Sequence, residues 1–132
     1  MEETKYSYAT FWQRLLAHNI DLLPILGIYY LISIIISYAG FDIIIMGSVY
    51  ILYHALFEVS KWQATPGKKW ARLKVSDENQ NHIILFKSVI RNLTKILSLI
   101  LFFGGFIMIL FNKRRKGLHD YIGGTLVLFK ED

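Results

Sequence analysis

The longest uncharged stretch of the chain places the strongest constraint on its fold. Residues 22–41 (LLPILGIYYLISIIISYAGF) carry no charged side chain, and the preceding FWQRLLAHNID is already helical in pattern. A transmembrane helix needs about 20 apolar residues at a rise of about 1.5 Å each. We therefore predict a transmembrane helix over about residues 15–38. A cleaved signal peptide is disfavoured because its apolar core is shorter, about 7–15 residues, and here a second apolar stretch follows at once.

Two further uncharged stretches follow. Residues 43–57 reach the length of a span only if the acidic residues that flank them lie near the two membrane interfaces, so we predict the second transmembrane helix over about residues 42–62. Residues 96–112 (ILSLILFFGGFIMILFN) are borderline in length, and the Gly104-Gly105 pair interrupts them. The third stretch is therefore predicted as a hydrophobic segment that either spans or re-enters the membrane.

The region between the second and third stretches is basic and polar. Eight Lys and Arg residues lie between Lys61 and Lys95, and Thr65-Pro66 predicts the N-cap and first residue of a helix. Two short strands are predicted at residues 72–76 and 83–86 around a polar turn. A β-like run at residues 125–129 is expected to pair with them.

Residues 86–97 are predicted to form an amphipathic helix. Lys87, Arg91 and Lys95 recur every four residues and share one face, and apolar side chains occupy the other. This pattern is typical of a helix in the headgroup plane of a bilayer, so we expect these three residues to face lipid. A solvated helix face is the alternative. Anionic lipid headgroups explain the basic region, and no nucleic-acid partner is expected.

The basic residues also predict orientation, because Lys and Arg near span ends mark the cytoplasmic side. The connection between the two spans, residues 38–42, carries no Lys or Arg. The segments that precede the first span and follow the second span are basic. We expect a hairpin with the N-terminus in the cytoplasm, in a bacterial inner (plasma) membrane. A full crossing by residues 96–112 would place the KRRK cluster at 113–116 outside, and a re-entrant segment would keep it inside. We favour re-entry; the spanning alternative stays open because re-entrant backbone must be buried by protein.

These patterns predict one domain over residues 1–132 with an all-α integral membrane fold. It consists of a two-helix transmembrane hairpin, a third hydrophobic segment, a small cytoplasmic β-like element and an interfacial amphipathic helix. The expected segments are the helices at about 15–38 and 42–62, the basic loop and interfacial helix at 63–95, the third segment at 96–112 and the basic tail at 113–132.

Charged residues inside the predicted spans are the candidate functional residues. Arg14, His18 and Asp21 are spaced i, i+4, i+7 and share a helix face, and His54 and Glu58 are spaced i, i+4 on the second helix. A carboxylate at membrane depth costs about 2.5–3.5 kcal/mol on insertion scales, so Asp21 must face protein or water. Matching the depths of the two helices predicts the pairs Arg14–Glu58, His18–His54 and Asp21–Tyr50.

Two interpretations of this polar set remain open. It is either an interhelical clamp that holds the hairpin together or a track that handles protons or cations. On either interpretation Asp21 is expected to pair with Arg14 or with a polar group on the second helix.

The remaining residue types argue against several chemistries. The chain has no Cys, which excludes disulfides and thiolate sites. No HxxxH or HExxH spacing occurs, so we expect no metal site. No nucleophile elbow and no P-loop occur either, so we expect no enzyme activity and no cofactor.

Four sequence blocks carry a family resemblance. They are FWQRLLAHNIDLL, ATPGKKWARLKV, RNLTKILSL and RRKGLHDYIGGTLVL, and in this order they resemble the RDD family of membrane proteins from about residue 8 to residue 129. The family is named for one Arg and two Asp, which match Arg14, Asp21 and Asp120 here. The resemblance singles out Asp120, which follows His119 in the basic tail and for which spacing alone predicts no role.

The resemblance implies less about function than about fold. Sodium/proton antiport has been assigned to some family members, and others behave as accessory domains in larger membrane complexes. We expect a non-enzymatic accessory or assembly factor that acts through another membrane protein. The alternative is an ion-coupled transporter such as a cation/proton antiporter that uses Arg14, Asp21 and Asp120. It would have to be a homo-oligomer, because two or three helices cannot enclose a pathway.

Overall fold

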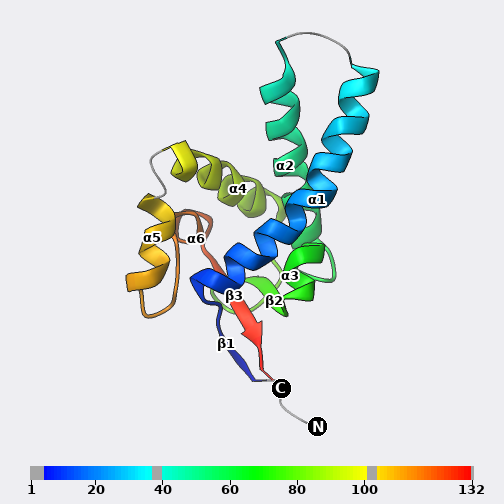
Figure 1. Ribbon diagram of the computed structural model, residues 1–132. Helices are drawn as coiled ribbons and strands as arrows, with labels where there is room; N and C mark the ends of the chain where they lie inside the picture. Colours follow the sequence, from blue (N-terminus) through cyan, green and yellow to red (C-terminus); the bar gives the residue numbers. More distant parts are fainter. Residues whose placement is uncertain (1–4, 37–39, 101–103, 132) are drawn as a thin grey trace.

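Two long apolar helices form a hairpin in the computed structural model, which describes residues 5–36, 40–100 and 104–131 (Figure 1). Helix α1 covers Phe11–Ile35 and helix α2 covers Asp42–Val59. By length and composition each is able to cross a membrane. The two predicted helices are therefore present, with α1 starting four residues earlier than expected. Residues 37 and 38 of the first predicted span lie outside the described residues.

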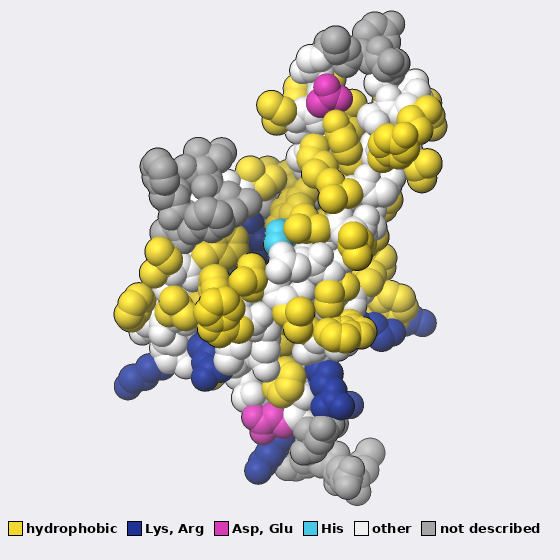
Figure 2. All heavy atoms as spheres, in the orientation of Figure 1, with side chains coloured by type: hydrophobic (Ala, Val, Ile, Leu, Met, Phe, Trp, Pro, Cys, Tyr) yellow, Lys and Arg dark blue, Asp and Glu magenta, His cyan; other side chains and the backbone are white. Residues whose placement is uncertain are grey.

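Helix α1 begins at a capping box. The Thr10 hydroxyl accepts the backbone N–H of Gln13 at 3.2 Å, and the Gln13 side chain accepts the backbone N–H of Thr10 at 2.8 Å. The far half of the hairpin exposes large apolar side chains, including Ile35 at 82% and Ile43 at 87% (Figure 2). Such a surface suits hydrocarbon rather than water.

A three-stranded antiparallel sheet lies at the opposite end of the molecule from the hairpin connection (Figure 1). Its strands are β1 (Tyr6–Tyr8), β2 (Leu73–Asp77) and β3 (Thr125–Lys130), in the order β1-β3-β2. The predicted pairing of residues 125–129 with residues 72–76 is confirmed, with Val75 opposite Val127. Strand β1 was not predicted.

The strand predicted at residues 83–86 is wrong. The Asp77 carboxylate accepts the backbone N–H groups of Asn79 and Asn81 at 2.9 and 2.8 Å, which closes the predicted polar turn. The chain then enters a helix at Leu85 instead of returning beside β2. Strand β3 takes the place beside β2 that a hairpin strand would have occupied.

Four shorter helices complete the fold. They are α3 (Pro66–Trp70), α4 (Leu85–Ile100), α5 (Gly104–Phe111) and α6 (Leu118–Gly123). The Thr65 side chain accepts the backbone N–H of Lys68 at 3.3 Å, so the predicted N-cap with Pro at the first position is confirmed. We call the three strands and α3–α6 the basal module. It packs on the end of the hairpin where α1 begins and α2 ends.

The third hydrophobic stretch is not one helix in the part of the chain that the structure describes. Helix α4 ends at Ile100, and α5 begins at the predicted interruption, Gly104-Gly105. With eight residues, α5 is about 12 Å long, well short of a bilayer core.

The described core consists of two apolar clusters. One lies under the sheet and includes Ala17, Leu73, Val75 and Val127. The other lies between α1 and α2 and is built from Ile25, Val49 and Tyr53. Many other buried side chains are polar or charged, among them Glu58, Arg91 and Asp120.

Candidate functional site

A chain of buried ion pairs joins the hairpin to the basal module. Arg14 of α1 donates to the Asp120 carboxylate of α6. The Arg91 guanidinium of α4 lies between two carboxylates, with Nε 3.1 Å from Asp120 Oδ1 and Nη1 2.5 Å from Glu58 Oε1 of α2. Glu58 and Asp120 are fully buried, and Arg91 is 1% exposed. Arg91 is thus the link between the second membrane helix and the C-terminal segment.

Asp120 also organises its own helix. Its Oδ2 accepts the backbone N–H of Gly117 at 3.1 Å at the start of α6, and the Thr125 hydroxyl lies 3.4 Å from its Oδ1. Burial opposes ionisation, but Arg14 and Arg91 hold the pKa of Asp120 well below its usual range. Asp120 is therefore an ionised carboxylate at neutral pH.

Glu58 is the centre of a second polar cluster. Its Oε1 accepts from Lys68 and Arg91, and its Oε2 accepts from Ser88 Oγ at 2.8 Å and Asn92 Nδ2 at 3.1 Å. Lys95 Nζ lies 3.7 Å from Oε1. One carboxylate thus serves three cations, two of them on α4.

Asp21 is satisfied by neutral donors. Its Oδ1 accepts the Tyr53 hydroxyl at 3.0 Å and the backbone N–H of Gly67 at 2.8 Å, and its Oδ2 accepts the Thr65 hydroxyl. Helix α3 approaches α1 very closely here, because a Cβ atom on Gly67 would lie 2.2 Å from the Ala17 carbonyl oxygen. Asp21 therefore fastens α3 and α2 to α1, which fits the clamp interpretation.

Of the three predicted interhelical pairs, one is confirmed. The rings of His18 and His54 stack with centroids 6.1 Å apart and planes at 16°. The Arg14–Glu58 pair is wrong, because α4 and α6 supply Arg91 and Asp120 as the actual partners.

The predicted partner of Asp21 is also corrected. The Asp21–Tyr50 pair is wrong, because the bonding hydroxyl belongs to Tyr53, three residues further along α2. The sequence predicted that Asp21 pairs either with Arg14 or with a polar group on the second helix. The second alternative is confirmed by the Tyr53 hydroxyl.

Two of the three cations in the basic stripe of α4 lie inside the protein. Arg91 and Lys95 are 1% and 7% exposed and point toward the carboxylates of α2 and α6. The prediction that they contact headgroups from the helix surface is therefore wrong, because two buried carboxylates require cationic partners. Lys87 is only partly buried, and its contact with lipid stays a prediction.

Several site residues were missed. They are Tyr53, Thr65, Lys68, Ser88 and Asn92. A signal for the last two was present, because Ser88, Arg91, Asn92 and Lys95 are spaced i, i+3, i+4, i+7. Small polar residues interspersed with the cations mark a face that bonds to protein.

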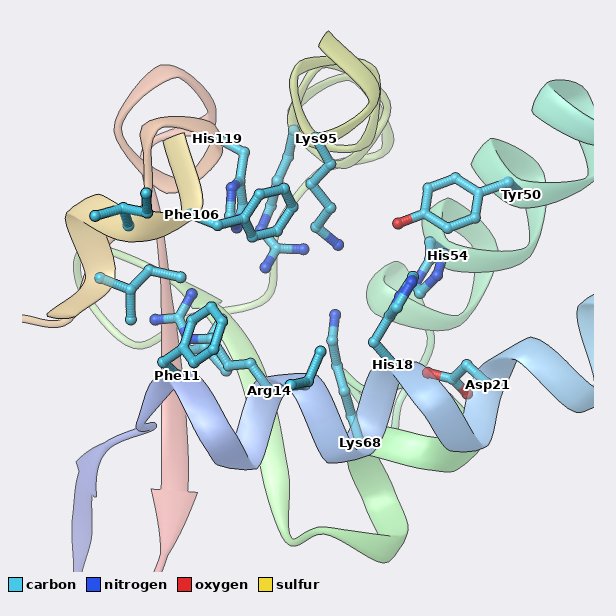
Figure 3. Close-up of a pocket in the computed structure, with 15 residues that line it drawn as sticks. Phe11, Arg14, His18, Asp21, Tyr50, His54, Lys68, Lys95, Phe106 and His119 are labelled. Atoms are coloured by element: carbon cyan, nitrogen blue, oxygen red, sulfur yellow. The ribbon is translucent and has the colours of Figure 1, made fainter. Parts of the chain in front are cut away.

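A cavity of about 250 Å³ opens beside this network (Figure 3). The side chains of His18, Tyr50, His54, Lys68 and Lys95 converge on it from α1, α2, α3 and α4. Apolar side chains of α1 and α5 also line it, among them Phe11, Leu15, Phe106 and Ile107.

Two histidines beside the cavity have unused ring nitrogens. Both nitrogens of His54, and Nδ1 of His119, are buried without a hydrogen-bond partner among the described residues. Burial lowers the pKa of His119 well below its usual value, so this ring is neutral at neutral pH. Within the described ranges no three His, Cys, Asp or Glu side chains are grouped to hold a metal ion.

Fold and site together define a small, mostly helical membrane-type protein with two apolar helices and a small antiparallel sheet. The model of the RDD family matches residues 8–124, and the chain belongs to this family. The family resemblance read from the sequence blocks is confirmed.

The chain is also similar to a bacterial protein. It is 42% identical over 87 residues to the uncharacterized protein YxaI of Bacillus subtilis (strain 168), which covers 66% of this chain and 57% of that protein. The matched region thus spans little more than half of the length of this relative. No solved structure matches the chain.

Proposed function

We propose that this protein is a non-enzymatic accessory or assembly factor that acts through a membrane partner. One observation carries the proposal: Arg14, Asp21 and Asp120, the residues that match the family name, all bond to other parts of the same chain. Groups used in this way hold the basal module on the hairpin, and they need no transported ion to explain them.

The apolar cluster of the hairpin supports this choice over transport. Beyond Asp21, the buried residues between α1 and α2 are Ile25, Val49 and Tyr53. Among the described residues this contact is mainly apolar beyond Asp21 and its partner Tyr53, and it offers an ion few polar groups toward the far end of the hairpin. A transporter would therefore have to build its pathway between several copies of the chain.

The sheet supports a cytoplasmic basal module. Strand β3 lies between β1, which precedes the first membrane helix, and β2, which follows the second. Since both flanking regions are basic, we place all three strands in the cytoplasm and residues 96–112 at or just below the cytoplasmic surface. In a bacterium this membrane is the inner membrane.

Cysteine labelling tests this topology, because the chain contains no natural Cys. In intact cells Gly40→Cys should react with an impermeant reagent. Gln80→Cys and Lys130→Cys should react only after permeabilisation. External labelling at Lys130→Cys would contradict the single-sided basal module.

Reconstitution tests the functional choice. The purified protein in proteoliposomes is expected to show no sodium- or potassium-driven proton flux above protein-free vesicles. A flux that Asp21→Asn abolishes while the melting temperature stays within about 2 °C of the unmodified protein would overturn the accessory role in favour of transport.

Photo-crosslinking tests the partner. A crosslinking residue at Ile35, on the exposed apolar part of the hairpin, is expected to capture one defined membrane protein in cells. The same residue at Glu131, which is exposed at the end of β3, is the control for non-specific capture. Identical products at both positions, or only lipid adducts at Ile35, would contradict the proposal.

A further inference from the structure

The cavity at the base of the hairpin carries more positive than negative charge. Four cationic side chains line it, from Arg14, Lys68, Arg91 and Lys95, and the network around it contains three carboxylates, from Asp21, Glu58 and Asp120. Asp21 accepts hydrogen bonds from three neutral donors, which are the Tyr53 and Thr65 hydroxyls and the backbone N–H of Gly67. Direct ion pairs to these four cations therefore come from Glu58 and Asp120, and the four cations outnumber the three carboxylates.

Lys95 is the cation that this network satisfies least. Its Nζ donates to Asn92 Oδ1 at 2.9 Å, but it lies 3.7 Å from the Glu58 carboxylate, which already accepts from Lys68 and Arg91. Burial, together with the charges of Arg91 and Lys68, lowers the pKa of Lys95 well below its usual value. A further anion beside Lys95 would relieve this repulsion.

Independent donors point to the same place. The His54 ring is 1% exposed, and neither nitrogen has a hydrogen-bond partner among the described residues. Figure 3 shows Lys95 and Tyr50 extending toward one another across the cavity, with His54 and His18 beside them. An imidazole N–H, a phenol O–H and an ammonium group around one space are donors suited to a phosphate or carboxylate oxygen.

The entrance to the cavity is apolar. Leu15 of α1 and Ile107 of α5 line the cavity and are 37% and 47% exposed. Figure 2 shows a histidine and a basic side chain in a recess surrounded by hydrophobic side chains, below the apolar surface of the hairpin. An acyl chain is stabilised by burying apolar surface against such a rim, whereas a free inorganic anion has no apolar surface to bury.

We propose that this cavity binds the phosphate headgroup of an anionic membrane lipid, with its acyl chains lying along the apolar rim. Lys95 and Lys68 supply the charge, and Tyr50 and His54 donate hydrogen bonds. The volume of about 250 Å³ suits a headgroup and not two acyl chains. This site differs from the headgroup contact that the sequence predicted on the outer surface of α4, because Arg91 and Lys95 of that basic stripe lie inside the protein.

Short-chain lipids test the proposal on the full-length protein in a neutral detergent. Dihexanoyl phosphatidylglycerol is expected to bind at least about tenfold more tightly than dihexanoyl phosphatidylcholine, because both lipids carry the phosphate but choline brings a further cation to a cavity already lined by cationic side chains. Lys95→Met should remove this preference. Lys87→Met, which removes an equal charge from the same helix at a residue outside the cavity wall, should retain it.

The other outcomes separate the sources of the anion. If sodium phosphate alone binds as tightly as phosphatidylglycerol, the ligand of the cavity is a free anion and not a lipid, and the proposal is overturned. Equal binding of the two lipids, or an unchanged preference in Lys95→Met, would also overturn it.

A second measurement needs no variant. A photoactivatable phosphatidylglycerol with its reactive group near the glycerol is expected to label residues 11–18 and 104–109 of the unmodified protein, and excess phosphatidylglycerol should suppress this labelling. Labelling confined to the exposed far half of α1 and α2 would contradict the proposal even if Lys95→Met failed to fold.

Discussion

Two of the buried carboxylates at the base of the hairpin, Asp21 and Asp120, are satisfied by different kinds of donor. Asp21 accepts two hydroxyls and a backbone N–H, whereas Asp120 accepts two guanidinium groups as well as a backbone N–H. The neutral site fixes helices that are already in close contact. The charged site joins α1 and α4 to a segment far away in the sequence, where long Arg side chains bridge the gap.

This difference determines which partner groups remain in the protein when the charge of each carboxylate is removed. Loss of the Asp21 charge leaves hydroxyls, which can reorient and accept instead of donate. Loss of the Asp120 charge leaves Arg14 and Arg91 buried with less compensation, and a buried unpaired charge is among the most costly defects in a folded protein. The predictions below follow from this contrast.

The largest effect is expected for Asp120→Asn. The substitution keeps the shape of the side chain but removes the charge that compensates two buried Arg, so the protein should lose about 3–5 kcal/mol of unfolding free energy. Thermal unfolding in a neutral detergent measures this loss. Glu131→Gln, at an exposed residue, is the control. A change below about 1 kcal/mol would show that the charged site is not what holds the C-terminal segment.

Gly67→Ala is expected to cost about 3 kcal/mol, the upper end of the range for overpacking. The new Cβ would lie 2.2 Å from the Ala17 carbonyl oxygen and 2.8 Å from the Asp21 Cγ, so α3 must move away from α1. Gly27→Ala is the matched control within α1, since a Cβ there meets nothing within 4 Å. It should be neutral or stabilising by up to about 1 kcal/mol. Equal melting temperatures for the two variants would contradict the close approach.

Asp21→Asn is expected to cost about 1 kcal/mol. One carboxamide oxygen still accepts from Tyr53 and Gly67, and the Thr65 hydroxyl can reverse to accept from the new amide. The same thermal unfolding measurement applies. A loss as large as that of Asp120→Asn would mean that Asp21 also compensates a buried cation, which would remove the contrast between the two sites.

An effect of opposite sign, and no larger than that of Asp21→Asn, is expected for Lys95→Met. The pKa of Lys95 is lowered in the folded protein, so between that pKa and about 10 the unfolded chain binds more protons. The Lys95 contribution to stability therefore rises with pH. Lys95→Met should be stabilised by about 1 kcal/mol at pH 7, and the difference should shrink toward pH 10. If the difference in unfolding free energy between the variant and the unmodified protein grows with pH, attraction by Glu58 stabilises the charged form of Lys95 more than burial destabilises it.

Sequence patterns predicted the features of the fold that depend on local residues. The two membrane helices follow from apolar length, and the start of α3 follows from Thr65-Pro66. The pairing of residues 125–129 with 72–76 also came from local patterns, because 125–129 is a short β-like run and 72–76 alternates polar and apolar side chains before a polar turn. Strand β1 has only three residues, and its position follows from its register with β3, which no local pattern records.

The partners in the charged site were beyond local patterns. Arg14 and Asp120 are 106 residues apart, so no helical spacing relates them. Arg91 and Lys95 formed a periodic basic stripe, which is identical whether it meets headgroups or buried carboxylates. Only the family resemblance drew attention to Asp120, and only the structure shows that its partner is Arg14.

The central claim is that Arg14 serves Asp120 and not Asp21, and double-mutant cycles test it most directly. Arg14→Gln is combined with Asp120→Asn in one cycle and with Asp21→Asn in the other, and unfolding free energies are measured for all single and double variants. We predict a coupling of about 1–3 kcal/mol in the first cycle and additivity within about 0.5 kcal/mol in the second. Additivity with Asp120→Asn together with strong coupling to Asp21→Asn would contradict the claim and restore the Arg14–Asp21 pair.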